Sequence, residues 1–314
     1  MSMSQSVTIV MYHYVRDLER TRFPRIKALP LERYIRQLDH LASAYTIISV
    51  EQLIDAMHEP TRRLPERSAL LTFDDGYSDH FQTVFPQLDR RGIPACFFPP
   101  VTAIVEHQVL DVNKIQFVLA AFPDAAALLH ETLQLLEEYR SNFNLASADH
   151  YQMASNEAHR YDDAQVITFK RLLQRELPGP VRKSITHRLF EKYVTQDEAA
   201  FAHELYMTPD QMACMVRHGM HFGSHGCSHA WMERLSPQEQ AAEIDRSIDF
   251  LRLIGQDEAC RTMCYPYGSF NASLVELLKA RNFKAGFTVE PRVADLNSEE
   301  PLLLPRLDTN DLPG

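Results

Sequence analysis

Short hydrophobic runs alternate along the chain with stretches in which apolar residues recur every three or four positions. Residues 7–15, 69–73 and 93–98 are rich in β-branched and aromatic side chains, as buried strands are. Between them, residues 31–41 and 81–88 place apolar side chains on one face of a helix. Strands and helices that alternate in this way predict βαβ units and a parallel sheet.

The pattern changes between residues 103 and 206. This stretch has few strand-like runs, and residues 128–140, 169–177 and 181–194 are typical of helices. We therefore expect a helical insertion between two strands of the main fold. Long insertions on α/β scaffolds often cover the binding face, so a lid is one interpretation. A packing or dimerisation appendage is the other, and dimerisation would make the chain a homo-oligomer through this insertion.

The alternation of strands and helices resumes at residue 207. Thr208 and Ser236 each precede a proline, with Gln or Glu three positions further on, which is the signature of a helix capping box. Strands are expected over residues 220–224, 262–266 and 283–289. The second half of the chain is therefore predicted to continue the same sheet.

Composition and charge narrow the class of protein. The 314 residues are 45% hydrophobic and carry a formal net charge of −10, which disfavours nucleic acid and anionic lipid surfaces as partners. No apolar run reaches the roughly 18 residues that a membrane-spanning helix needs. The first residues lack the basic and apolar regions of a secretory signal, and none of the five cysteines forms a CxxC pair. These features predict a soluble cytoplasmic protein.

Acidic side chains follow one of the predicted strands directly. Asp74 and Asp75 come after the apolar residues 69–73 and before Gly76. Neighbouring carboxylates at the end of a buried strand are costly to desolvate, and a bound cation would remove that cost. The alternative is that one aspartate caps the next helix while the other is solvated.

Histidines follow a second strand. His221, His225 and His229 are spaced four residues apart, and such pairs can bind one Zn²⁺ through their imidazole nitrogens. The glycines between them argue against a helix, so the geometry would be that of a strand end and a loop. With 14 histidines in the chain, some pairs at this spacing arise by chance, and an unliganded surface loop is the alternative.

The aspartates and histidines are stronger evidence for a metal site when they are considered together. In an α/β barrel the carboxyl ends of the strands meet at one face, so the two groups can converge on a single ion. One aspartate and two histidines leave coordination positions open for water, which is typical of a catalytic metal site. The second aspartate is then free to act as a base.

These motifs, in this order, resemble the polysaccharide deacetylases, the NodB homology domain of carbohydrate esterase family 4. The family motifs correspond to TFDDG at residues 72–76, SHGCSH at 224–229 and YPYG at 265–268. MYHYV at residues 11–15 and LPR at 304–306 also look like bacterial members of the group. The resemblance implies an α/β fold, a deformed TIM-like (β/α) barrel.

The resemblance covers about residues 7–100 and 207–308. We accordingly expect one discontinuous barrel domain within residues 1–314, formed by about 7–102 and 207–308. The helical insertion occupies about residues 103–206.

The resemblance also implies roles for individual residues. Asp75, His225 and His229 would hold the metal, with Zn²⁺ preferred and Co²⁺, Ni²⁺ or Fe²⁺ as alternatives. Asp74 would be the general base, and the backbone N–H of Tyr267 would donate to the developing oxyanion. The products would be acetate and a free amino sugar.

Two positions depart from the family pattern. The arginine that often precedes the Pro-Tyr-Gly turn and pairs with the base is replaced by Cys264 or Tyr265, and our hypothesis is that Arg261 or Arg306 substitutes for it. The late histidine that often protonates the leaving amine has no clear counterpart. His13, at the end of the first strand, is the candidate for that role.

We therefore predict a hydrolase acting on carbon–nitrogen bonds that removes an N-acetyl group from an amino sugar. The substrate would be a polysaccharide or a precursor of lipopolysaccharide or another envelope glycan. Two alternatives stay open on the same fold: an allantoinase-like amidohydrolase of small molecules, and a catalytically silent saccharide-binding protein. The departures from the family motifs motivate the silent protein, whereas the intact aspartates and histidines favour the enzyme.

Overall fold

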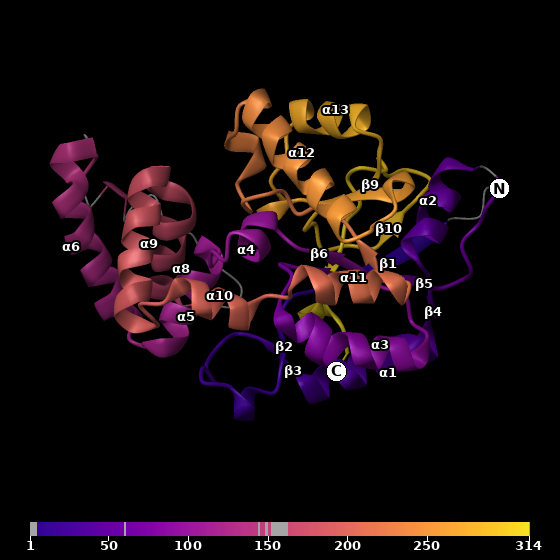
Figure 1. Cartoon of the computed structure of the whole chain (residues 1–314), viewed down its shortest axis with the longest axis horizontal. Coiled ribbons are helices and arrows are strands. Elements are labelled where there is room, and N and C mark those ends of the chain that lie inside the picture. Colours follow the sequence, from indigo (N-terminus) through magenta and orange to yellow (C-terminus); the bar gives the residue numbers. More distant parts are fainter. Residues whose placement is uncertain (1–4, 60, 144, 148–149, 152–162, 314) are drawn as a thin grey trace. The chain divides into compact units, whose positions relative to one another are not determined.

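The computed structural model describes residues 5–59, 61–143, 145–147, 150–151 and 163–313 (Figure 1). The chain divides into two compact units. The first consists of residues 1–17, 28–108 and 202–314, and the second of residues 18–27 and 109–201. Some residues of the predicted insertion, among them 152–162, lie outside the described part of the chain.

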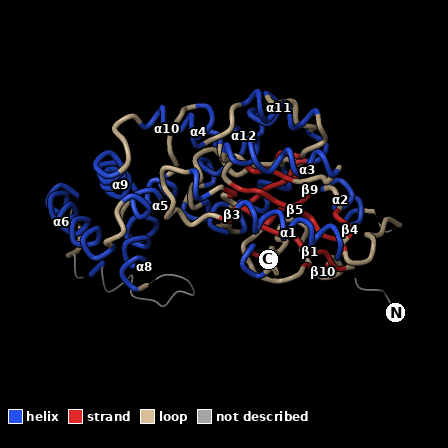
Figure 2. Tube along the Cα trace, turned by 90° about the horizontal axis from the view of Figure 1, so that it is seen from below, coloured by secondary structure: helices blue, strands red, loops and turns tan. Residues whose placement is uncertain are grey.

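The strands of the first unit pair in a ring. β1 (Ser6–Tyr12), β5 (Ser68–Asp74), β6 (Cys96–Phe98) and β7 (His221–Phe222) follow one another in parallel. β5 is buried along its whole length, as expected for a parallel strand covered on both faces. Figure 2 shows β1 and β5 with helices around them.

Parallel pairing continues beyond β7 and closes the ring. Ser224 bridges to β8 (Arg261–Cys264), and β8 pairs with β9 (Phe283–Phe287). Leu304 then bridges to the end of β9, and β11 (Leu307–Asp308) pairs with β1. Since some of these links are single bridges, the barrel is deformed, and the predicted fold is confirmed.

Further strands and helices complete the first unit. The short strands are β2 (Val15–Arg16), β3 (Leu29–Pro30), β4 (Thr46–Ile47) and β10 (Ala294–Asp295). The helices are α1 (Leu31–Ala44), α2 (Val50–His58), α3 (Phe85–Arg91), α4 (Val101–Val105), α11 (Pro209–Arg217), α12 (Pro237–Leu253) and α13 (Ala272–Ala280).

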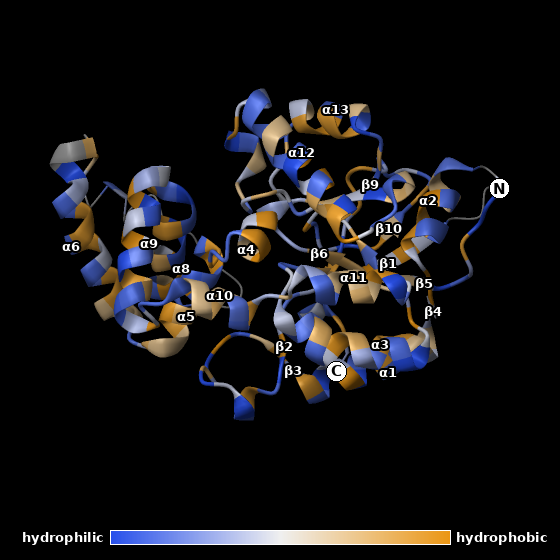
Figure 3. Cartoon of the chain, viewed as in Figure 1, coloured by the Kyte–Doolittle hydropathy of each residue, from blue (hydrophilic) through white to orange (hydrophobic). Residues whose placement is uncertain are grey.

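Local sequence explains where several of these helices begin and end. Thr208 and Ser236 form the predicted capping boxes at the starts of α11 and α12. Gly92 ends α3 in the left-handed conformation at φ 62°. α12 buries Ile244 and Ile248 while its other face is hydrophilic, and Figure 3 shows this mixture of hydropathy on the helix.

Several predicted strands are shorter than expected. The strand expected over residues 7–15 stops at Tyr12, its last pairing position with β5, and His13 leaves the sheet before β2 begins. The strand expected over residues 262–266 ends at Cys264, two residues before Pro266, which has no N–H for a ladder. As a result, the candidate site residues His13 and Tyr267 lie outside the sheet.

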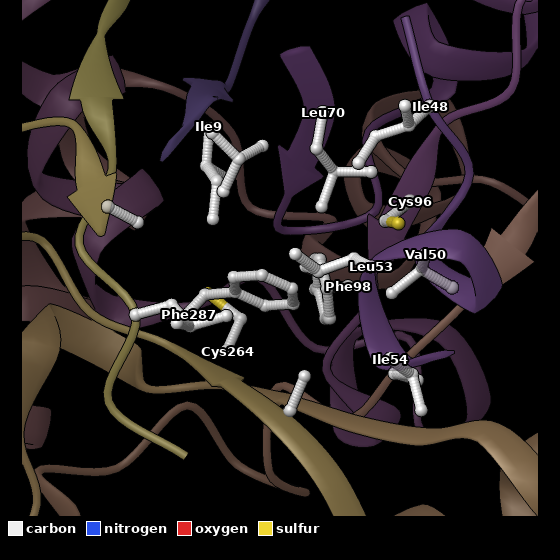
Figure 4. Packing of buried hydrophobic residues seen from close by; sticks show 14 residues of the cluster. Ile9, Ile48, Val50, Leu53, Ile54, Leu70, Cys96, Phe98, Cys264 and Phe287 are labelled. Carbon is white, nitrogen blue, oxygen red and sulfur yellow. The ribbon is translucent and has the colours of Figure 1, made fainter. Parts of the chain in front are cut away.

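The core of the first unit contains side chains from strands far apart in the sequence. Figure 4 shows Ile9, Leu70, Phe98 and Phe287, from four strands, together with Leu53 of α2. Burying one side chain of this size stabilises a fold by roughly 1.5–3 kcal/mol. The strand ends that carry the site are therefore held by a well-packed interior.

The second unit is helical. Its helices are α5 (Asp111–Ala121), α6 (Ala125–Phe143), α8 (Ala164–Arg171) and α9 (Gly179–Tyr193), and α10 (Glu198–Leu205) runs from this unit into the first. α5 packs on α9, and α6 packs on α8 and α9 (Figure 1). Lys114 forms an ion pair with Glu198 at 2.8 Å inside this unit. Within the described residues, no helix is both long enough and apolar enough to cross a membrane.

Candidate metal centre

Asp74 and Asp75 lie at the carboxyl end of β5. Asp74 is the last residue of β5, and Asp75 follows in the left-handed conformation at φ 70°, with its N–H donating to the carbonyl of Phe98 at 3.0 Å. Gly76 is also left-handed, and a Cβ there would lie 2.7 Å from the Cβ of Pro99. This tight turn sends the two carboxylates, 2% and 4% exposed, toward different partners.

Asp74 forms a two-pronged ion pair with Arg306. Nη1 donates to Oδ1 at 2.9 Å and Nη2 donates to Oδ2 at 2.8 Å, and the arginine is fully buried. Burial alone would raise the pKa of Asp74, but Arg306, with help from His225 and His13, outweighs burial and holds the pKa at about 2. Asp74 is therefore an ionised and oriented carboxylate.

The other donors of Arg306 fix the guanidinium in place. Nε donates to the carbonyl of Thr288 at 2.9 Å, Nη1 to the hydroxyl of Thr72 at 3.0 Å, and Nη2 to the sulfur of Cys264 at 3.1 Å. Arg261, the other arginine that the sequence suggested, bonds instead to Glu258 and to a backbone carbonyl. Arg306 therefore occupies the place beside Asp74.

Asp75 faces two histidines. Its Oδ1 lies 3.4 Å from Nε2 of His225 and 3.3 Å from Nε2 of His229. The other ring nitrogen of His225, Nδ1, lies 2.8 Å from the carbonyl of Cys264, to which it donates. That bond makes Nδ1 the donor and leaves Nε2 as the nitrogen directed toward Asp75, which a neutral His225 offers to a metal as a lone pair.

The two oxygens of Asp75 have different surroundings. Oδ2 accepts a hydrogen bond from the hydroxyl of Tyr77 at 2.5 Å. Oδ1 is buried and has no hydrogen-bond partner among the described residues. Burial would raise the pKa of this carboxyl, but His225 and His229 outweigh it and hold the pKa well below its usual range. Oδ1 is thus a buried, ionised oxygen that faces the two imidazoles.

These observations fit a divalent cation. A carboxylate oxygen and two imidazole nitrogens are a donor set that zinc accepts, and a cation there would satisfy the buried Oδ1. Asp74, His225 and Cys264 also lie close enough together to form a ligand group. Because Arg306 already donates to both Asp74 and Cys264, an ion there would face a guanidinium. The Asp75 group fits better.

His13 and Tyr267 border this centre. Nε2 of His13 lies 3.9 Å from Oδ2 of Asp74, and the His13 side chain is 43% exposed, so it meets both the site and solvent. Tyr267 has a left-handed backbone at φ 58°, and its ring centroid lies 4.6 Å from that of His229. Trp231 stacks on Tyr267 with centroids 4.4 Å apart.

The third histidine of the spaced set lies outside the centre. His221 is buried in β7, where Nε2 lies 2.9 Å from the hydroxyl of Thr262 and Nδ1 lies 3.2 Å from the amide of Gln256. Sequence reasoning missed Tyr77, which contacts Asp75, and Trp231, which stacks on Tyr267. Tyr77 directly follows the aspartate motif, and Trp231 is the chain's single tryptophan, so position and rarity were the available signals.

Comparison with known proteins points to one family. The polysaccharide deacetylase family model matches residues 61–166 and 185–286. YxkH of Bacillus subtilis (strain 168), named for the same family, is 28% identical over 96 residues, 30% of this chain and 34% of that protein. The poly-β-1,6-N-acetyl-D-glucosamine N-deacetylase of Escherichia coli (strain K12) is 32% identical over 91 residues, 29% of this chain and 13% of that protein.

Solved structures share the fold over nearly the whole chain. The Streptococcus pyogenes deacetylase PplD, in complex with acetate, has a TM-score of 0.58 at 16% identity and covers 98% of this chain and 93% of its own. IcaB from Ammonifex degensii has a TM-score of 0.56 at 17% identity, covering 96% and 91%. At identities of 16% and 17%, the similarity to these solved structures establishes the fold alone.

The family match extends beyond the motifs on which the resemblance was based. It includes parts of the stretch between residues 103 and 206, which the motif-based resemblance left out. It confirms the predicted family and supports a hydrolase acting on carbon–nitrogen bonds. The matched segments make up most of the sequence, so the chain belongs to the polysaccharide deacetylase family.

Proposed function

We propose that this chain is a metal-dependent N-deacetylase of an N-acetylated amino sugar. The observation that carries the proposal is that the neighbouring residues Asp74 and Asp75 have different partners. Asp74 is held by Arg306, whereas Asp75 presents an unsatisfied oxygen to His225 and His229. One carboxylate is thus prepared as a base and the other as a metal ligand.

Asp75, His225 and His229 would hold the metal, and Zn²⁺ is the first candidate for this donor set. Zinc bound there would supply Lewis acidity, which polarises the acetamide carbonyl and lowers the pKa of water. Co²⁺, Ni²⁺ and Fe²⁺ are the alternatives that these ligands also accept.

The surrounding side chains would move the protons. Asp74 would accept a proton from the attacking water, and Arg306 would keep its carboxylate ionised and oriented. His13, which lies beside Asp74 and reaches solvent, would protonate the leaving amine. The backbone N–H of Tyr267 would donate to the oxyanion. Water adds to the acetamide carbon, the carbon–nitrogen bond breaks, and acetate and an amine leave.

The ion pair between Asp74 and Arg306 favours an enzyme over a silent saccharide-binding protein. Burying an arginine and a carboxylate together is costly, and a protein that only bound sugar would gain nothing from a base oriented in this way. The missing arginine of the family motif, which motivated the silent protein, has its counterpart in Arg306.

The substrate proposal draws on the relatives. The Escherichia coli relative is named for poly-β-1,6-N-acetyl-D-glucosamine, but the match spans only 13% of it. A β-1,6-linked N-acetylglucosamine oligomer is therefore the first substrate to test. Precursors of lipopolysaccharide or another envelope glycan come next, and allantoin serves as the probe for the amidohydrolase alternative. A cytoplasmic location stays a prediction.

The test combines metal content with acetate release. Wild type, His229→Ala and the control His221→Asn would be purified, supplied with zinc and analysed by mass spectrometry and an acetate assay. We expect about one zinc per chain and acetate release in wild type and His221→Asn, and neither in His229→Ala. A wild type without stoichiometric metal would contradict the proposal, as would turnover of allantoin with no acetate released from any N-acetylated sugar.

A further inference from the structure

The hydroxyl of Tyr77 is committed to one oxygen of Asp75. It donates to Oδ2 at 2.5 Å, while Oδ1 faces the two histidine nitrogens. The tyrosine is completely buried and the aspartate nearly so.

Aromatic rings fix the position of the Tyr77 ring. Tyr14 stacks on it with centroids 3.9 Å apart and an interplanar angle of 21°. Tyr206 lies nearly parallel at 6.1 Å, and His80 meets the ring edge-on at 5.6 Å. Contacts on several sides leave the hydroxyl little freedom to leave Asp75.

The backbone around Tyr77 is fastened as well. Tyr77 and Tyr206 form an antiparallel bridge, and the N–H of Met207 donates to the carbonyl of Gly76 at 2.9 Å. The hydroxyl of Ser78 donates to the carbonyl of Glu204 at 2.8 Å. Residues on either side of Tyr77 are therefore tied to one segment, which limits movement of the turn that carries Asp75.

Other buried tyrosines show that such a hydrogen bond does not follow from burial alone. The hydroxyls of Tyr12 and Tyr34 are also buried, and neither has a hydrogen-bond partner among the described residues. Tyr77 differs from them in that its hydroxyl meets a carboxylate whose second oxygen lies at the candidate metal centre.

We propose that Tyr77 is a positioning residue for the metal ligand Asp75. It holds Oδ2, so that Oδ1 is the oxygen presented to the cation, and Tyr14 and Tyr206 hold its ring in place. The proposal rests on the proposed metal site. Hydrogen bonds to metal-ligating carboxylates typically change metal affinity by 10–100-fold.

The test measures zinc affinity without substrate. Wild type, Tyr77→Phe and the matched control Tyr34→Phe would compete for zinc with a chromogenic chelator. We expect the dissociation constant to rise by about 10–100-fold in Tyr77→Phe and to stay unchanged in Tyr34→Phe. The melting temperatures of the metal-free proteins, measured alongside, would show whether each variant is folded.

A second variant removes the support and keeps the hydroxyl. Tyr14→Leu deletes the stacked ring and with it the phenol that hydrogen-bonds to Tyr77, and we expect its zinc affinity to fall by less than that of Tyr77→Phe. Zinc affinity in Tyr77→Phe equal to that of wild type would overturn the positioning role while leaving the metal site intact. A wild type that binds no zinc would overturn the metal site, and the positioning role with it.

Discussion

Asp74 and Asp75 are neighbours in the chain and are buried almost equally, yet their charges are balanced in different ways. The charge of Asp74 is neutralised by Arg306 through two hydrogen bonds. One oxygen of Asp75 is bonded to Tyr77, whereas the other faces two imidazoles and has no hydrogen-bond partner among the described residues. A buried charge needs compensation, so a carboxylate that the protein only partly satisfies marks the place where a cation is expected.

The largest effect is expected when each aspartate is neutralised in turn. Asp74→Asn should keep its zinc and lose about 10²–10⁴ in kcat, since a general base contributes that much. Asp75→Asn should lose most of its zinc affinity and at least as much activity, because the ligand charge is gone. Metal content and acetate release of the two variants measure both effects. Equal zinc loss in both variants would remove the distinction between the aspartates.

The next largest effect concerns the contribution of the ion pair between Asp74 and Arg306 to the stability of the fold. Arg306→Met leaves Asp74 buried without its partner, so we expect the free energy of unfolding of the metal-free protein to fall by about 3–5 kcal/mol. Urea unfolding at neutral pH measures the loss. Arg252→Met, which breaks an exposed ion pair, is the control and should cost far less. A loss no larger than in the control would mean that the buried pair is not needed for stability.

The same pair predicts a pH dependence with a defined sign. Asp74 has a pKa of about 2 in the fold, against an ordinary value near 3.8, so the folded state binds fewer protons than the unfolded state. Its contribution, about 2 kcal/mol, is therefore complete above about pH 4 and lost as the pH falls toward 2.

Arg306→Met removes the strongest of the charges that oppose burial, so the pKa of Asp74 rises and the carboxylate contributes less to stability at neutral pH. The difference in unfolding free energy between wild type and Arg306→Met should thus grow from about pH 2 to about pH 6. A difference that is constant over this range would contradict the ion-pair assignment.

The smallest effect distinguishes the two groups of metal-ligating side chains. Cys264→Ala removes the sulfur of the Asp74 group and leaves the backbone carbonyl that orients His225. We expect zinc stoichiometry and affinity to stay unchanged within error, measured by the same chelator competition. A clear loss of zinc would move the ion to the side of Asp74.

Local sequence was sufficient for much of the fold. Alternating strands and helices predicted the parallel barrel, and the capping boxes at Thr208 and Ser236 were correct. Asp74, Asp75, His225 and His229 were recognised because strand ends of a barrel meet at one face. The ends of the strands were less certain, since pairing with neighbours decides where a strand such as β1 stops.

Local sequence patterns could not predict the directions in which the side chains point. His221 and His225 share the spacing that suggested a metal pair, but His221 points to Thr262 and Gln256. Tyr77 follows the aspartate motif immediately, yet its bond to Asp75 depends on the left-handed turn at Asp75 and Gly76. Neither fact follows from spacing alone.

The sequence by itself determined the family, the barrel and the set of reactive side chains, because these depend on local patterns and on motif order. Only the tertiary structure decided which arginine meets Asp74. Arg306 lies 232 positions from Asp74, and the two come together because β11 pairs with β1 and closes the ring of strands. A contact across that distance depends on how the whole barrel closes, which no short stretch of sequence encodes.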